Sequence, residues 1–121
     1  MLATSSARTH TALIVERQRL IVPFLRSILA QAGFRPVSGK ATAGTLKRVR
    51  PDAIVLCFDR GAVRPLETIR RARAATARAR IVVITRGDDP AWNALARAFG
   101  ADTVLGPAAD GRALSEAVIA R

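Results

Sequence analysis

The chain has 121 residues, of which 50% are hydrophobic and 24% are charged. This length and composition fit one globular domain and exclude a disordered chain. Lys and Arg total 20 against 9 Asp and Glu, which gives a formal net charge of +11. Such a surface favours acidic partners, whether nucleic acid, an acidic protein face or anionic lipid. The other interpretation is that an Arg- and Ala-rich composition places Arg on solvated helix faces that bind nothing.

The sequence contains no apolar run of the roughly 18–20 residues that a membrane-spanning helix needs. Residues 1–10 also lack the apolar core of a secretory signal. We expect residues 1–10 to form a flexible tail and residues 11–121 to form a single domain without membrane insertion. Cys57 is the one cysteine and cannot form an internal disulfide, which indicates a reducing, cytoplasmic environment.

Short apolar strands alternate with helical segments along the whole chain. Residues 11–15 predict a buried strand, and residues 19–32 predict a helix that ends at Gly33. The inner side of this helix is expected to carry Ile21, Phe24, Leu25, Ile28 and Leu29.

The remaining elements follow the same alternation. Strand 34–37 contains Pro36, so it should be short or lie at a sheet edge. After it we expect, in order, helix 42–50, strand 53–58, helix 65–77, strand 81–84, a helix from Asp89 to Gly100, strand 103–105 and helix 110–120.

This alternation predicts a flavodoxin-like (βα)₅ fold of the α/β class, a doubly wound parallel five-stranded sheet with helices on both faces. In such sheets, binding and catalytic sites form at the carboxyl ends of the strands. The residues at those ends are Glu16-Arg17, Cys57-Phe58-Asp59, Thr85-Arg86 and Gly106-Pro107.

Four segments together resemble the receiver domain of two-component response regulators. The first is the strand, turn and helix of residues 11–33, and the second is Pro51-Asp52 before an apolar strand. The third is strand 81–84 with Thr85 at its end, and the fourth is Gly100-Ala101-Asp102, followed by a short strand and Gly106-Pro107. The resemblance covers roughly residues 11–121 and implies the receiver fold.

The resemblance also implies what the carboxyl ends of the strands should do. In that family an aspartate at the end of the third strand accepts a phosphoryl group from a histidine kinase. Two acids hold magnesium, and a threonine and a lysine contact the phosphoryl oxygens. The corresponding positions here are Cys57 for the acceptor, Glu16 and Arg17 for the acids, Thr85 for the threonine and Gly106 for the lysine. A thiol does not replace the acceptor carboxylate, and a guanidinium repels magnesium.

The resemblance therefore implies a pseudo-receiver with no catalytic residue, no bound metal and no cofactor, which is not an enzyme. We expect Arg17 to occupy the would-be metal position, near Glu16 or Asp59. Asp59 lies two residues beyond Cys57 and so on the same side of an extended strand, which leaves open a third interpretation as an active receiver with an unusual acceptor. Cys57 itself is either a thiol activated by Arg17 or a small apolar core residue, and we favour the core residue.

Basic residues concentrate on two of the predicted helices, at Lys47 and Arg48 and at Arg70, Arg71 and Arg73. In this topology the two helices lie on the same face of the sheet, so we expect one basic surface. The preferred function is protein binding without phosphorylation, with a kinase, another receiver, an output protein or a second copy as partner. The alternative is a basic accessory protein that binds nucleic acid or another polyanion non-specifically, although aromatic residues for base stacking are scarce and no recognition helix is appended.

Overall fold

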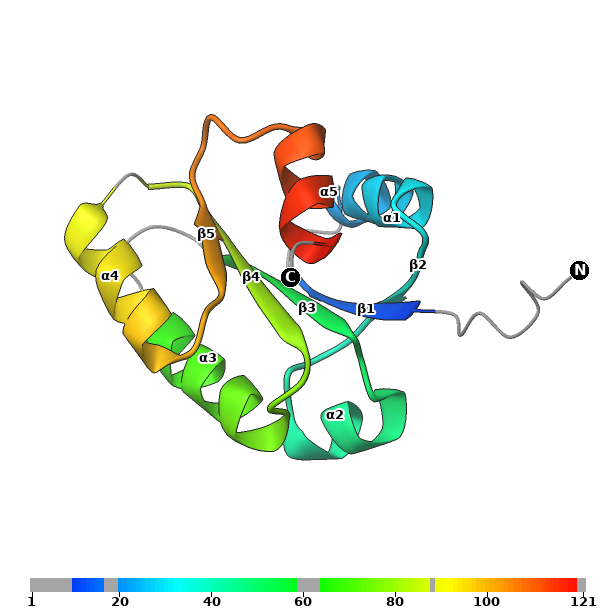
Figure 1. Ribbon diagram of the computed structural model, residues 1–121, viewed down its shortest axis with the longest axis horizontal. Helices are drawn as coiled ribbons and strands as arrows, with labels where there is room; N and C mark the ends of the chain where they lie inside the picture. Colours follow the sequence, from blue (N-terminus) through cyan, green and yellow to red (C-terminus); the bar gives the residue numbers. More distant parts are fainter. Residues whose placement is uncertain (1–9, 17–19, 59–63, 88, 120–121) are drawn as a thin grey trace, which may run out of the picture.

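The computed structural model describes residues 10–16, 20–58, 64–87 and 89–119. Five parallel strands form one sheet with the order β2-β1-β3-β4-β5. Figure 1 shows α1 and α5 on one face of this sheet and α2, α3 and α4 on the other. The predicted flavodoxin-like (βα)₅ fold is thus confirmed. The strands are β1 (His10–Val15), β2 (Phe34–Ser38), β3 (Ala53–Phe58), β4 (Arg80–Thr85) and β5 (Thr103–Leu105).

Two of the helices, α2 and α4, begin at residues whose side chains cap them. Thr42 caps α2 by accepting a hydrogen bond from the Thr45 backbone, and Asp89 caps α4 by accepting from Ala91 and Trp92. The helices are α1 (Val22–Gln31), α2 (Ala43–Val49), α3 (Arg64–Ala75), α4 (Pro90–Phe99) and α5 (Gly111–Ile119). None of the helices in the described ranges is long and apolar enough to cross a membrane.

Two sequence-based expectations are corrected here. His10, which was assigned to the tail, is the first residue of β1 and pairs with Phe34 of β2; the rest of the expected tail lies outside the described residues. Phe24, which was expected on the inner side of α1, is 61% exposed. The reason is angular, because Phe24 lies about 100° around the helix from the buried Leu25 and so falls on its flank.

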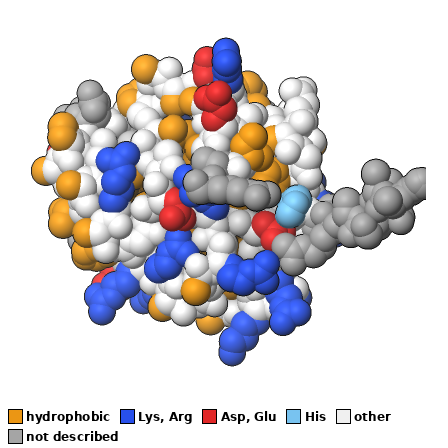
Figure 2. All heavy atoms as spheres, viewed as in Figure 1, with side chains coloured by type: hydrophobic (Ala, Val, Ile, Leu, Met, Phe, Trp, Pro, Cys, Tyr) orange, Lys and Arg blue, Asp and Glu red, His pale blue; other side chains and the backbone are white. Residues whose placement is uncertain are grey.

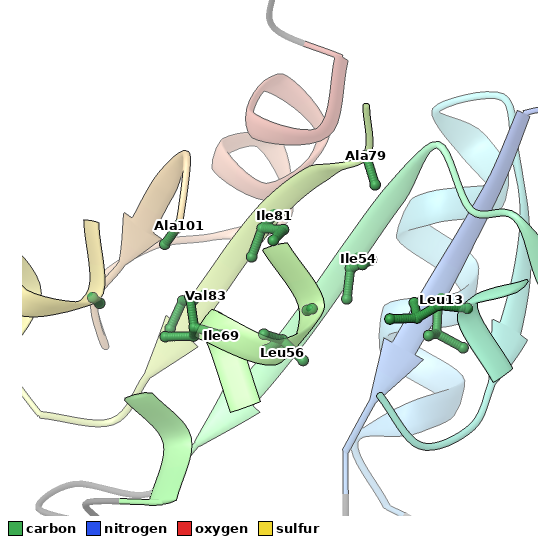
Figure 3. Packing of buried hydrophobic residues seen from close by; sticks show 11 residues of the cluster. Leu13, Ile54, Leu56, Ile69, Ala79, Ile81, Val83 and Ala101 are labelled. Carbon is green, nitrogen blue, oxygen red and sulfur yellow. The ribbon is translucent and has the colours of Figure 1, made fainter. Parts of the chain in front are cut away.

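Alternating strand residues supply a separate core for each face of the sheet. Leu13, Ile54 and Leu56 point toward the layer of α2, α3 and α4 (Figure 3), whereas Ile14 and Val55 point toward α1 and α5. All five are buried, since a central parallel strand covered on both faces must be apolar at every position.

Two aspartates join neighbouring strands at the amino end of the sheet. Asp52 donates its backbone N–H to the Thr11 carbonyl at 2.7 Å and accepts the Thr11 N–H on its carboxylate at 2.8 Å. Asp102 makes the same pair of bonds with Ile81, both at 2.8 Å. Because the carboxylate satisfies an N–H that the sheet leaves unpaired, an aspartate just before the strand is favoured at both places.

Candidate functional site

The carboxyl ends of four strands place the predicted site residues along one edge of the sheet. Val15 pairs with Leu56, so Glu16 reaches the level of Cys57 in β3. On the other side of β3, Phe58 pairs with Thr85 of β4. Ile84 pairs with Leu105, which places Gly106 at the level of Thr85. The structure therefore brings Glu16, Cys57, Thr85 and Gly106 together in the order of the strands.

Cys57 is partly buried and packs against the core on the side of α1 and α5. Burial, followed by the charge of Glu16 and a hydrogen bond to Glu16, raises the pKa of the thiol to about 12, while Arg86 acts in the opposite direction. The thiol is consequently protonated at neutral pH. This argues against the activated-thiol interpretation and favours the core residue.

Thr85 and Gly106 frame the other half of the edge. Thr85 is 5% exposed, and its hydroxyl oxygen accepts the Gly87 N–H at 3.2 Å. The threonine oxygen is thus engaged in a local turn. Gly106 has no side chain to offer, although a Cβ there would meet nothing within 4 Å.

Magnesium prefers oxygen ligands, and of the four residues Glu16, Cys57, Thr85 and Gly106 only Glu16 supplies a carboxylate, beside a protonated thiol. The Arg86 cation, which is close enough to influence the thiol, adds repulsion. Over the described ranges no three His, Cys, Asp or Glu side chains come together as a metal site. These donors do not fit magnesium. Arg17 and Asp59 lie outside the described residues, so their expected positions stay predictions.

Arg73, which was predicted to belong to the basic surface, instead connects α3 to the segment between α4 and β5. Its guanidinium pairs with Asp102 at 2.7 Å and donates to the Gly100 carbonyl at 3.1 Å. It also donates to the carbonyls of Thr76, Ala77 and Ala79 just beyond α3. The physical reason for the correction is that Arg73 is partly buried at a helix end, where unpaired carbonyls attract a cation. Lys47, Arg48, Arg70 and Arg71 are exposed, and their role as a binding surface stays a prediction.

Sequence reasoning missed the role of Arg80, the first residue of β4. Its guanidinium donates to the Ala117 carbonyl near the end of α5 and, at 3.2 Å, to the Thr103 hydroxyl. The one available signal was an arginine at the start of an otherwise apolar strand. Arg73 and Arg80 also line a hollow of about 470 Å³ at the amino end of the sheet. In this hollow both guanidinium groups are already engaged, because they donate hydrogen bonds to groups at the ends of helices and strands.

Comparisons with known proteins agree with this geometry. No protein-family model matches the sequence, and no curated protein matches it. Among solved structures, a response regulator from Burkholderia pseudomallei aligns with a TM-score of 0.76 and 20% identity, over 92% of this chain and 67% of the other. That structure holds a phosphorylated aspartic acid, a calcium ion and citrate. A CheY-like receiver domain protein from Methanospirillum hungatei aligns with a TM-score of 0.76 and 18% identity, over 90% of both chains.

The chain has the receiver-domain fold. A response regulator from Burkholderia multivorans adds a match at 25% identity with a TM-score of 0.68, over 90% of this chain and 91% of the other. The receiver fold explains why sequence segments with weak individual signals occur in this order. In this fold Glu16, Cys57, Thr85 and Gly106 lie at the carboxyl edge of the sheet.

Proposed function

We propose that this domain is a degenerate receiver that binds a protein partner in two-component signalling without being phosphorylated. The observation that carries the proposal is the chemistry at the end of β3. A protonated thiol, hydrogen-bonded to Glu16, stands where the resemblance calls for an acceptor carboxylate. An acceptor must present a nucleophile, and a thiol with a pKa of about 12 is almost entirely un-ionised at pH 7.

The electrostatics of the same edge support this proposal. Phosphoryl transfer depends on cations that neutralise the developing charge, and these are held in place by carboxylates and a lysine. Of the four residues that define this edge, only Glu16 carries a carboxylate, and Gly106 leaves the lysine position without a side chain. The fold is kept while the groups that chemistry needs are replaced.

Its partners would be a kinase, another receiver or an output protein, acting in the cytoplasm. A second copy is a further partner, because α4 exposes Leu95, which is 47% accessible, together with small residues around it. Sedimentation velocity of the wild type and of Leu95→Glu would test this self-association. A monomer at all concentrations in both proteins would remove the second copy from the proposal.

Phosphorylation itself is tested with acetyl phosphate and magnesium, followed by intact mass measurement. We expect no added phosphoryl group, because neither a nucleophilic acceptor nor a metal site is formed by the described residues. The matched control is Asp59→Asn, which removes the one other candidate acceptor near the strand end. A stoichiometric, base-labile adduct on the wild type that is lost in Asp59→Asn would overturn the proposal and establish an active receiver.

A further inference from the structure

We propose that the exposed cations of α2 and α3 form a docking surface for an acidic protein partner. This α2–α3 basic surface is defined by Lys47 and Arg48 of α2 and by Arg70 and Arg71 of α3. The inference rests on the proposed function, since it names where and by what chemistry the domain would bind its partner. It concerns the outer side of two helices and is separate from the carboxyl edge of the sheet.

The cations are unevenly distributed over the five helices. In their sequences, α2 and α3 have 7 and 12 residues and contain six Lys or Arg. In contrast, α1, α4 and α5 have 10, 10 and 9 residues and contain one Arg each. A compositional bias toward Arg would load all outer helix faces alike. The observed segregation therefore argues against an effect of composition alone.

The four cations of the surface also lack a partner within the part of the chain that the structure describes. Among the described residues, none of them makes a hydrogen bond or an ion pair, whereas Arg26 bonds Ser38 and Arg112 pairs with Glu116. No acidic residue occurs in α2, and Glu67 is the single acid of α3. The helices pack side by side on one face of the sheet. Their like charges repel one another, so carboxylates supplied from outside would relieve this repulsion.

The positive charge can be followed on the surface of the molecule. Figure 2 shows Lys and Arg side chains gathered along the lower part of the view, where Figure 1 places α2 and the adjoining end of α3. Arg70 and Arg71 carry planar guanidinium groups that match carboxylates in a bidentate geometry. A protein face or segment rich in Asp and Glu fits this array.

An acidic protein fits better than nucleic acid because of what the surface lacks. No aromatic residue occurs in α2 or α3, so there is no platform on which bases could stack. Both helices lie flat against the sheet, where Leu46 and Ile69 are buried, and neither projects as a helix that could enter a groove. Binding of nucleic acid would therefore rest on phosphate contacts alone, and the affinity of such contacts falls steeply as the salt concentration rises.

The test is fluorescence anisotropy with a labelled 20-residue peptide of Glu and Asp, and with a labelled 20-base-pair DNA duplex, across a salt series. The intact domain should bind the peptide and retain measurable binding at 150 mM salt. The variant Arg70→Glu/Arg71→Glu should bind the peptide at least tenfold more weakly. The matched control, Arg26→Glu/Arg112→Glu, makes the same change in net charge on the opposite face of the sheet and should bind like the wild type.

Each contrary result is decisive. Equal losses in both variants would show that net charge, rather than the α2–α3 basic surface, drives binding. No peptide binding by a folded wild type would also overturn the proposal. Tighter binding of the duplex than of the peptide at 150 mM salt, lost in Arg70→Glu/Arg71→Glu, would replace the acidic protein by nucleic acid. None of these outcomes involves phosphoryl transfer, so failure here is distinguishable from failure of the pseudo-receiver proposal.

Discussion

At the scale of single residues, Cys57 shows how one side chain changes the chemistry of a strand end. A carboxylate at the end of β3 would be ionised at neutral pH and would gather cations. The thiol is instead held in its neutral form by burial and by Glu16, both of which oppose the thiolate. Arg86 lowers the pKa too little to offset them. A neutral side chain can therefore pack against the core without a counter-ion.

The first prediction is that Cys57 of the folded domain resists alkylation. Raising a thiol pKa from 9.0 to about 12 lowers the thiolate fraction near pH 8 by about a thousandfold, and the thiolate is the reactive form. Alkylation by iodoacetamide, followed by mass spectrometry, should be far slower in the folded protein than in urea. Its rate should still rise with pH beyond pH 10.

The same pKa shift has a consequence for stability. A pKa raised in the folded state means that the folded protein binds the proton more tightly, so the stabilisation is complete below about pH 9 and is lost as the pH rises toward 12. The matched variant is Cys57→Ser, whose hydroxyl does not titrate in this range, and it should remove this part of the loss of stability at alkaline pH.

In the alkylation experiment, rapid modification of the folded protein that levels off near pH 8 would contradict the raised pKa of Cys57.

At the scale of elements, the boundaries that the sequence predicted best are those marked by helix-capping or helix-breaking residues. Asp89 and Gly100 enclose α4, and the short strand β5 was predicted at its observed residues, because each boundary residue either caps a helix or breaks it. The start of α1 and the burial of Phe24 were predicted less well. Periodicity assigns a broad apolar stripe, and only tertiary packing decides which side chains at its margin are covered.

Long-range side-chain contacts could not be predicted in this way. Arg73 belongs to α3 in sequence, but its partners Gly100 and Asp102 are 27 and 29 residues away. From the sequence alone it was one arginine among several on a basic helix. Only the fold shows that this guanidinium joins the end of α3 to the turn between α4 and β5. The same limit applies to the carboxyl edge, where the sequence placed Cys57 in the strand that became β3 but could not show that Glu16 forms a hydrogen bond with its thiol.

The second prediction concerns this junction between α3 and α4. Gly100 has a φ of +130°, and a Cβ there would lie 2.6 Å from the Cβ of Arg73. Gly100→Ala should therefore strain the backbone and displace Arg73, which lowers the free energy of unfolding by about 1–3 kcal/mol. The matched control is Gly44→Ala in α2, where a Cβ meets nothing within 4 Å. It should be neutral or stabilising by up to about 1 kcal/mol.

Urea unfolding of both variants, monitored by circular dichroism, measures the difference. Equal stabilities of Gly100→Ala and Gly44→Ala would show that the Arg73 junction contributes nothing measurable.

At the scale of the whole molecule, most of the residues that fold the chain are separate from those of the candidate site, although Cys57 also packs against a core. The two cores lie on the faces of the sheet and are built from strand residues such as Leu13 and Ile14. The candidate site lies at the carboxyl edge, and the structural charges of Arg73 and Arg80 lie at the opposite edge. Substitutions at the carboxyl edge can therefore alter function while leaving most of the packing intact, which is consistent with the proposed loss of phosphorylation in a retained receiver fold.

The third prediction tests this separation by rebuilding the site. The variant Arg17→Asp/Cys57→Asp/Gly106→Lys restores the acid pair, the acceptor and the lysine that the receiver resemblance implies. There is room for the lysine, because nothing lies within 4 Å of a Cβ at Gly106. Clustered carboxylates repel one another, so the variant should be less stable than the wild type without a divalent cation. Magnesium should raise its melting temperature and leave that of the wild type unchanged.

With magnesium and acetyl phosphate, the rebuilt variant should gain one phosphoryl group by intact mass, mapped to residue 57. Cys57→Asp alone is the control, and it should gain none, because Arg17 still opposes metal binding and Gly106 still lacks the lysine. The rebuilt variant could fold, be stabilised by magnesium and yet take up no phosphoryl group. That result would show that the identity of these three residues alone does not explain why the wild type is not phosphorylated. The positions of this edge would then differ from those of an active receiver in geometry as well as in residue type.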